Sequence, residues 1–388
     1  MKIVIASDSY KGSCTTLEVA NAIEKGIKKI LKDVDIIKIL VADGGEGTVD
    51  ALVIGTDGIY DEVEVVGPLG EKIMAKYGIL DDNIGVIEMA AASGLTLVQE
   101  SKRNPMITTT YGTGQLIKAA IDRGCKKILV GIGGSATNDG GAGMAQALGF
   151  SLKDKDGKEI GYGGGELSKL FTIDSSGVDP KLRETEIIVI SDVSNPLCGP
   201  NGASYVYGPQ KGASLEAIKQ LDFNLKHYAS IIKKSFGKDI IDFPGAGAAG
   251  GLGAGLITFC NAELCSGIEK VLDITNIDMY LEDADFVITG EGQIDGQSIY
   301  GKAPIGVAKR AMKHNVPVLA IVGSIGEGVA EVYSHGVDAI MDIINKPMTL
   351  NEAIQDASTL IEQTAENAMR TLLLGSHRIK RRETICKL

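Results

Sequence analysis

Short runs of apolar, mostly β-branched residues recur near both ends of the chain. A short continuous apolar run is typical of a strand that is buried on both faces of a parallel sheet. The pattern predicts five such strands, at residues 3–6, 36–41, 286–289, 318–322 and 339–344. Two of them precede residue 45 and three follow residue 285, so we expect one sheet assembled from both ends of the chain.

Two segments near the chain ends carry complete signals for the start of a helix. Thr15 with Glu18, and Thr349 with Glu352, have the spacing of a capping box, in which each side chain bonds the backbone amide of the other residue. Apolar residues follow both boxes at helical spacing. These signals predict amphipathic helices of the kind that cover a parallel sheet.

The middle of the chain has a different pattern of apolar and polar residues. Its strand candidates are residues 64–67, 85–89, 127–132 and 186–191, and its helix candidates are residues 114–123 and 215–236. The simplest arrangement is an α/β doubly wound domain, made of residues 1–62 and 283–376, that is interrupted by a second α/β domain at residues 63–282. Residues 377–388 are rich in Lys and Arg, and we expect a solvated basic tail there.

Charge and cysteine usage restrict the function. The net charge of 39 − 50 = −11 disfavours a non-specific hold on nucleic acid or on an anionic membrane, but it leaves an anionic small substrate open. The longest uncharged stretch, residues 243–262, contains six glycines and is a poor membrane helix. Six cysteines occur without a Cys-x-x-Cys pair, which favours reduced thiols and a cytoplasmic protein.

Glycine is the one strongly enriched residue. The chain has 50 glycines in 388 residues, which is well above the usual ~7 per cent. They cluster between predicted strands and helices, at residues 43–48, 131–141, 244–251 and 289–296. One such cluster is typical of a plain turn, but three of these four also carry carboxylates. Backbone amides bind phosphate, and Mg²⁺ takes one or two carboxylates with phosphate oxygens, so together they indicate a phosphate and metal site.

Other chemistries find less support. The motif Gly245-x-Gly247-x-x-Gly250 fits the dinucleotide-binding pattern, but only a weak strand candidate at 240–243 precedes it. The acid that this pattern needs about 20 residues further on would be Glu269, which no predicted strand precedes. An NAD-linked dehydrogenase is therefore the less favoured alternative. The chain has no Gly-x-Ser-x-Gly and no His-Glu-x-x-His. Its Gly-Lys pairs at 157, 237 and 301 lack the Ser or Thr of a Walker A motif. A phosphotransferase would therefore need another kind of phosphate cradle.

Eight segments, taken in order, resemble the bacterial glycerate kinase family over residues 1 to about 375. They are residues 7–13, 41–48, 89–95, 131–141, 192–197, 208–212, 244–251 and 289–295. The chain has Ser7 where the family commonly has proline, a change at a strand end that touches none of the proposed chemistry. The basic tail is not part of the family pattern.

The resemblance implies ATP-dependent phosphorylation of D-glycerate with Mg²⁺. It also implies a flavodoxin-like domain interrupted by a second α/β domain that is likened to restriction enzymes, in agreement with the insertion inferred above. The usual product of such a protein is 2-phosphoglycerate. A glycerate 3-kinase, or a kinase of another small hydroxy acid, stays open at this point.

Roles can be assigned by position. Asp8, Asp43 and Glu291 each follow a predicted strand end of the first domain, so we expect them to converge on one crevice that faces the insert. Asp8 is placed with the reacting groups. Asp43, Glu291 and Asp295 are the predicted metal ligands. For Asp43, and for Asp139, a helix N-cap is the alternative, because each precedes a glycine turn.

In the insert, the turn Gly133-Gly134-Ser135, with Thr137, is the best candidate to hold ATP phosphates by backbone amides, ahead of a helix predicted at 142–148. The loop that contains Gly245 and Gly247 is the second candidate.

Three further side chains complete the assignment. Asp192 follows an apolar strand and is the candidate general base or metal ligand, with Glu291 and Asp295 as alternatives. Lys11 and Lys211 are the candidates to compensate the glycerate carboxylate and the transferring phosphate. Their alternative is a solvated surface charge.

Overall fold

The computed structural model describes the backbone of residues 1–385 and the side chains of residues 1–374. The basic stretch at 377–388 therefore lies outside the residues whose side chains are described. The chain forms two compact units, the first from Met1–Asp43 with Ile268–Leu388 and the second from Gly44–Gly267. These bounds differ from the junctions near 62 and 283 that strand placement indicated.

The difference comes from two short helical segments. Helix α2 (Thr48–Gly55) packs on β4 (Lys72–Leu80) and β5 (Ile84–Glu88), so it belongs with the second unit. Helix α10 (Ile277–Leu281) packs on α11 (Ala303–Lys313), so it belongs with the first unit. Strand positions alone could not place these helices, because helix packing partners are not read from the strands.

The first unit is a flavodoxin-like α/β fold, as the sequence predicted. Its other elements are β1 (Lys2–Ser7), α1 (Thr16–Ile30), β2 (Asp35–Lys38), β11 (Phe286–Gly290), β12 (Val318–Val322), β13 (Ala339–Asp342), α12 (Leu350–Gln355) and α13 (Ala357–Ile385), and α9 (Gly267–Ile274) begins at its boundary. All five strands are parallel, in the order β13-β12-β11-β1-β2. Numbered within this sheet, that order is 2-1-3-4-5, whose direction of winding reverses between β1 and β11.

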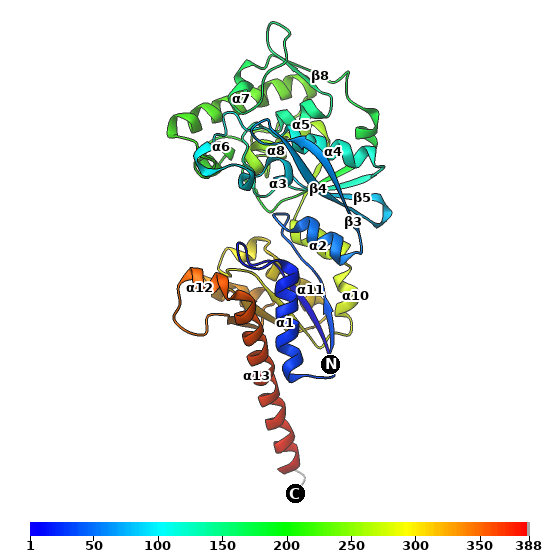
Figure 1. Cartoon of the computed structure of the whole chain (residues 1–388), viewed down its shortest axis with the longest axis vertical. Coiled ribbons are helices and arrows are strands. Elements are labelled where there is room, and N and C mark those ends of the chain that lie inside the picture. The colour runs from blue at the N-terminus through cyan, green and yellow to red at the C-terminus, as the bar shows by residue number, and fades with distance from the viewer. Residues whose placement is uncertain (386–388) are drawn as a thin grey trace. The chain divides into compact units, whose positions relative to one another are not determined.

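Both predicted capping boxes are present in the first unit. Thr15 and Glu18 cap α1, and Thr349 and Glu352 cap α12. Helices α1 and α13 lie side by side (Figure 1). The strand expected at 36–41 ends at Lys38. The Ile39 amide makes one more hydrogen bond to β1, at the Ile5 oxygen, and the chain then leaves the edge of the sheet.

The second unit is built on a mixed six-stranded sheet. Its other elements are β3 (Ile59–Val66), α3 (Ala90–Ser93), α4 (Tyr111–Asp122), β6 (Lys127–Gly131), α5 (Ala142–Ala147), β7 (Ser151–Lys153), β8 (Thr172–Asp174), β9 (Glu186–Ile190), α6 (Ala203–Tyr207), α7 (Leu215–Phe236), α8 (Ala248–Phe259) and β10 (Glu263–Cys265). The sheet order is β10-β9-β6-β5-β4-β3. Strand β4 is antiparallel to both of its neighbours, β3 and β5, and the pairs among β5, β6, β9 and β10 are parallel.

Strand β4 is the longest strand that the sequence reading missed, beside the three-residue strands β7, β8 and β10. The register Val66↔Lys72 joins it to β3 as a hairpin. Its first half alternates between exposed and buried positions, since Lys72, Met74 and Lys76 are exposed while Ala75 and Tyr77 are buried. A search for continuous apolar runs passes over such a strand, because a strand with antiparallel neighbours needs only one buried face.

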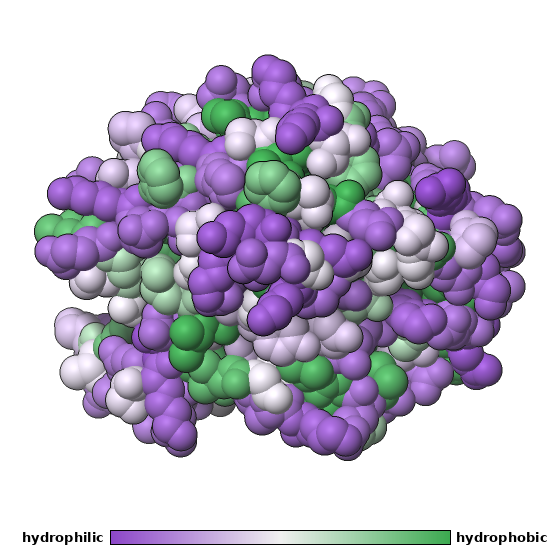
Figure 2. Space-filling view, turned by 90° about the horizontal axis from the view of Figure 1, so that it is seen from above, coloured by the Kyte–Doolittle hydropathy of each residue, from purple (hydrophilic) through white to green (hydrophobic). Residues whose placement is uncertain are grey.

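The molecular surface is mainly polar. The view from above shows hydrophilic side chains with apolar residues in small, separate areas (Figure 2). Among the described residues, no helix is both long and apolar enough to span a bilayer. This accords with the reading of residues 243–262, which form a glycine loop and helix α8.

The contact of α1 with α13 depends on Gly26. A Cβ atom at this position would lie 2.3 Å from the backbone oxygen of Glu362 and 2.8 Å from Cβ of Ala365. Gly26→Val should therefore push the two helices apart and destabilise the first unit by about 1–3 kcal/mol, as overpacking does.

Thermal unfolding followed by far-UV circular dichroism measures this effect, and the chain has no tryptophan that could report it by fluorescence. Lys25→Val, at an exposed position of the same helix, is the control for the lower helix propensity of valine. A Gly26 variant as stable as the Lys25 variant would contradict the close packing.

Candidate active-site residues

Two carboxylates lie at the point where the winding of the first sheet reverses. Asp8 directly follows β1 and Glu291 directly follows β11, and these two strands are neighbours. The Asp8 amide bonds the Gly290 oxygen at 2.9 Å, which ties the two strand ends together. Asp8 is 6% exposed and Glu291 is 8% exposed. In doubly wound sheets ligands bind at such a switch point, so these acids occupy the expected place.

Burial perturbs Asp8 strongly. Loss of solvent, with added repulsion from Asp43, raises the pKa of Asp8 to about 7, even though the Ser9 amide donates to its Oδ1 at 2.6 Å and Lys11 lies nearby. A carboxyl group with this pKa exchanges its proton near neutral pH. Such a group can act as a general acid or base, or can accept a cation.

Lys11 and Asp43 form an ion pair beside Asp8. The Lys11 ammonium lies 3.3 Å from Oδ2 of Asp43, and 64% of the Lys11 side chain is exposed. Asp43 is not an N-cap of α2, because the N-cap residue of that helix is Gly47 and has no side-chain bond. The structure therefore brings together Asp8, Lys11 and Asp43, three of the residues that the sequence singled out.

Glu291 and Asp295 share a lysine that the sequence reading did not select. Lys302 lies 3.3 Å from Oε2 of Glu291 and 3.9 Å from Oδ1 of Asp295. The Ser298 hydroxyl donates to Oε1 of Glu291 at 2.8 Å. Burial raises the pKa of Glu291, although Lys302 and Ser298 oppose the shift. Gly301-Lys302 was considered only as a failed Walker A motif, so a glycine-lysine pair near a carboxylate loop was the available signal.

The carboxylates of the first unit do not form a metal site by themselves. Within residues 1–374, no group of three or more His, Cys, Asp or Glu side chains is placed to hold a metal ion alone. Mg²⁺ is commonly held by one or two carboxylates together with phosphate oxygens and water. The donors at Asp43, Glu291 and Asp295 fit that mode, whereas a zinc site would need more protein ligands.

In the second unit, the predicted phosphate loop follows β6 at the carboxyl edge of the sheet. A Cβ atom on Gly133 would lie 2.8 Å from Cα of Gly45, so only glycine lets this loop lie against the loop at residues 44–47. Gly134 is exposed and has φ +73°. No hydrogen bond among the described residues uses the amide of Gly134 or of Ser135. These two donors are available to an anion.

The end of the same loop is filled by the carboxylate of Asp139. It accepts from the amides of Thr110, Gly141 and Gly143 and from the Thr110 hydroxyl, so it serves the beginnings of both α4 and α5. Burial raises its pKa and these bonds oppose the rise. Asp139 is not itself the N-cap residue, which is Gly141 in α5 and Thr110 in α4, but its carboxylate engages amides at the beginnings of both helices.

Lys211 lies inside the second unit beneath the Gly133–Thr137 loop. It ends a 3₁₀ turn, Pro209–Lys211, and is only 1% exposed. Its ammonium donates to Oγ of Ser135 at 2.8 Å and to the backbone oxygen of Thr137 at 2.7 Å. Burial lowers the pKa of Lys211 to about 7, with Asp139 opposing the shift. A solvated surface charge, the alternative for this residue, does not describe it.

The second glycine loop is packed rather than open. Gly245 and Gly247 are buried, and a Cβ atom on Gly247 would lie 2.1 Å from the Pro196 oxygen. The Gly247 amide bonds the Asn195 oxygen at 3.0 Å. Residues 240–243 form no strand, so the structural context of a dinucleotide fingerprint is missing. Close backbone packing accounts for these glycines, and a role in nucleotide binding stays a prediction.

Asp192 follows β9 and is exposed. Its Oδ1 accepts from the amide of Gly267, the first residue of α9, at 3.1 Å.

Glu88, at the end of β5, was not selected from the sequence. Its carboxylate accepts from the Val49 amide at 2.7 Å and thereby caps α2, and burial raises its pKa to about 7 against the bonds from Val49 and Gly47. An isolated acid at a strand end gives no signal that separates such a cap from a reacting group.

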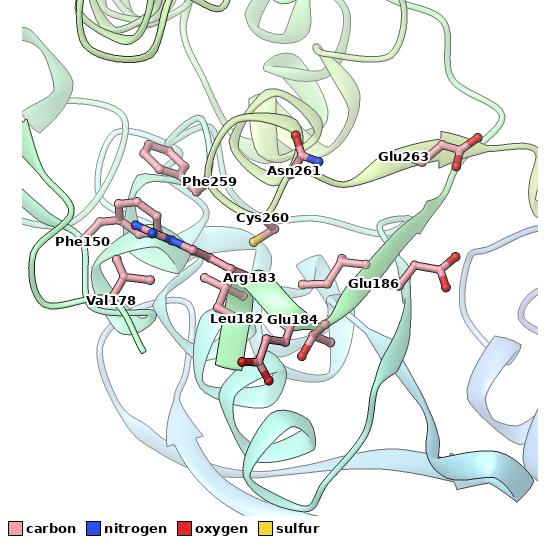
Figure 3. Close-up of a pocket in the computed structure, with 12 residues that line it drawn as sticks. Phe150, Val178, Leu182, Arg183, Glu184, Glu186, Phe259, Cys260, Asn261 and Glu263 are labelled. Carbon is pink, nitrogen blue, oxygen red and sulfur yellow. The ribbon is translucent and has the colours of Figure 1, made fainter. Parts of the chain in front are cut away.

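A pocket at the opposite edge of the second sheet is a separate feature (Figure 3). It has a volume of about 580 Å³ and lies at the first residues of β9 and β10, with Phe150 and Phe259 on its apolar side and Glu186 and Glu263 at its rim. Ligands of parallel sheets bind at the carboxyl ends of the strands, so this pocket lies at the wrong edge for that role.

Comparison with known proteins identifies relatives over almost the whole chain. The model of the "Glycerate kinase family" matches residues 3–373. A glycerate kinase of Halalkalibacterium halodurans is 53% identical over 94% of this chain and 96% of its own length. A glycerate 2-kinase of Escherichia coli K12 is 53% identical over 97% of this chain and 99% of its own length.

A solved structure agrees in fold. A crystal structure described as that of a glycerate kinase 2 from Salmonella typhimurium LT2 superimposes with a TM-score of 0.87 and 50% identity, and the match covers 97% of this chain and 99% of that one.

Asp8 should make stability depend on pH. The pKa of Asp8 is about 7 in the folded state and near 4 in the unfolded chain. The free energy of unfolding should therefore fall as pH rises from about 4 to about 7, and above pH 7 the whole loss is present. Asp8→Asn cannot ionise and should therefore stabilise the protein more at pH 8 than at pH 5, by roughly 1–3 kcal/mol.

Urea unfolding at the two pH values, followed by circular dichroism, measures this difference. Asp33→Asn, at an exposed position, should show little change between pH 5 and pH 8. The same response from the Asp8 and Asp33 variants would show that Asp8 is ionised at no cost.

Proposed function

Since the chain belongs to the glycerate kinase family, we propose that it transfers the γ-phosphate of ATP to the 2-hydroxyl group of D-glycerate and forms 2-phosphoglycerate. One observation carries the reaction and the position of the product. It is the similarity, over nearly the full length of both chains, to a protein named as a glycerate 2-kinase. We expect the enzyme to work in the cytoplasm with a small-molecule substrate and without nucleic acid or membrane.

In this proposal the Gly133–Ser135 turn binds the phosphates of ATP. The amides of Gly134 and Ser135 make no hydrogen bond within the described residues, and the buried cation of Lys211 lies behind them. Preorganised amides aimed at an anion need no rearrangement during the reaction, which is the main way proteins accelerate phosphoryl transfer.

The acids of the first unit take the metal and the substrate. Asp43, Glu291 and Asp295 are proposed to hold Mg²⁺, which would neutralise the charge on the phosphate oxygens. Asp8, with its pKa of about 7, is proposed to lie beside them among the reacting groups, and Asp192 is proposed as the general base. Lys11 is proposed to pair with the glycerate carboxylate, because its ammonium is exposed and Asp43 orients it.

The reaction itself is tested by ADP release coupled to a second enzyme, with D-glycerate, L-glycerate and other small hydroxy acids as acceptors. Phosphorus NMR of the product then separates 2- from 3-phosphoglycerate. The proposal expects D-glycerate as the preferred acceptor and the 2-phosphate as product. No ADP release with any acceptor, together with reduction of NAD, would favour a dehydrogenase instead.

Lys11→Ala should raise the Michaelis constant for D-glycerate more than that for ATP, because the lost cation faces the acceptor carboxylate. A roughly 10-fold or larger rise is expected for the loss of a charge-assisted bond. Lys32→Ala, at an exposed lysine beyond α1, is the matched control. An equal rise in both constants would reject the carboxylate assignment of Lys11.

Asp192→Asn tests the general-base assignment. Turnover should fall by roughly 10²- to 10⁴-fold, since a base of this kind typically contributes that much. Folding should be preserved, because the amide oxygen of Asn still accepts from Gly267. Near-normal turnover would remove Asp192 from this role and would leave Asp8 as the candidate.

A further inference from the structure

Lys211 is a buried cation with an unusual set of contacts. Its ammonium touches a hydroxyl and a backbone oxygen, and it has no carboxylate within 4 Å among the described residues. Burying a charge without an ionic partner is costly. The glycine turn above it is where we propose that ATP phosphates bind. An anion bound at that turn would supply the missing charge.

The contact with Ser135 fixes the direction of one proton. An ammonium group has three donors and no acceptor, so Oγ of Ser135 must accept from Lys211. The hydrogen of the Ser135 hydroxyl then points away from the lysine, and no described residue accepts it. Ser135 is 7% exposed and follows the exposed Gly134, so its hydroxyl lies at the floor of the turn.

We infer that Lys211 is a positioning residue for the nucleotide, which acts through Ser135 instead of touching the substrate. The ammonium orients the Ser135 hydroxyl as a third donor beside the amides of Gly134 and Ser135, and it holds the turn through the Thr137 oxygen. This inference rests on the proposed function. It differs from the direct charge compensation expected from the sequence, which would require Lys211 to reach the phosphate.

The hydrogen bond from Ser135 to the phosphate sets the size of the effect. A hydrogen bond to a charged group is worth enough to change a dissociation constant by roughly 10- to 100-fold, and Lys211 contributes by orienting the hydroxyl that makes this bond.

A double-mutant cycle separates action through Ser135 from direct contact. Lys211→Met keeps the unbranched side chain, one heavy atom shorter, and removes its charge, and Ser135→Ala removes the hydroxyl group. Isothermal titration calorimetry with MgATP gives the dissociation constant of each single variant and of the double variant. We expect Lys211→Met to weaken binding by roughly 10- to 100-fold in the parent chain and by less than about 5-fold when Ser135 is already Ala.

Equal factors in the two backgrounds would overturn the inference, since additive effects mean that Lys211 does not act through Ser135. Unchanged MgATP binding in both single variants would overturn it as well. A parent protein that neither binds MgATP nor phosphorylates D-glycerate would reject the proposed function itself, so the two failures are distinguishable.

Three controls exclude a general structural effect. Lys219→Met makes the same chemical change at an exposed lysine of α7 and should leave MgATP binding unchanged. The Michaelis constant for D-glycerate should stay within about 3-fold of the parent value in both site variants. Circular dichroism establishes that each variant is folded, and if Lys211→Met fails to fold, the Ser135→Ala variant alone still tests whether the hydroxyl binds the nucleotide.

Proton uptake gives a readout that a purely structural lysine would not change. Asp139 is the acidic side chain whose charge acts on Lys211, and Ser135 and Thr137, which touch the ammonium, do not titrate near neutral pH. Because burial lowers the pKa of Lys211 to about 7, a bound anion should return its proton at pH 8.

Calorimetry in buffers of different ionisation enthalpy should therefore show up to about one more proton taken up by the parent than by Lys211→Met. Equal proton uptake in the two proteins would show that no anion binds near Lys211.

Discussion

The close approach of backbone to backbone at the carboxyl edge of the second sheet is the constraint on which the candidate phosphate site depends. The loop after β6 lies against the loop at residues 44–47 so closely that a Cβ atom on Gly133 would collide with Cα of Gly45. Gly247 meets the Pro196 oxygen in the same way. This packing holds a turn in which the amides of Gly134 and Ser135 make no hydrogen bond within the described residues. The enrichment in glycine is therefore partly a packing requirement and only partly a phosphate signature.

Charge burial is the second organising feature. Asp8, Glu291 and Lys211 are each almost fully buried, and burial moves each pKa toward neutrality, upward for the acids and downward for the lysine. Asp139 is also buried but is satisfied by three amides and a hydroxyl, so it serves helix ends. The number of donors around a buried charge thus separates a structural role from a functional one, and residue type alone does not.

The fold was predicted well where local signals agree. Continuous apolar runs located the five strands of the first sheet, and two capping boxes located the beginnings of α1 and α12. Strand β4 was missed because an antiparallel strand with one buried face shows alternation instead of a run. Of the site residues, Asp8, Lys11, Asp43, Glu291 and Asp295 lie at the strand ends and loops that the sequence indicated. Glu88 was overlooked because its partner, the Val49 amide, is far away in the chain, and Lys302 was overlooked because its Gly-Lys pair was weighed only as a Walker A motif.

The sequence by itself determined the family and the α/β class and indicated the loops proposed to carry the chemistry, since these follow from motifs and from local hydrophobic patterns. It could not determine which glycines pack and which remain open, because that depends on segments more than 50 residues apart, such as residues 44–47 and 131–137. It also could not show that Lys211 is buried beneath Ser135. Burial and pairing of a charge are properties of the tertiary structure, because they depend on the desolvation and on the partners that only the folded chain provides.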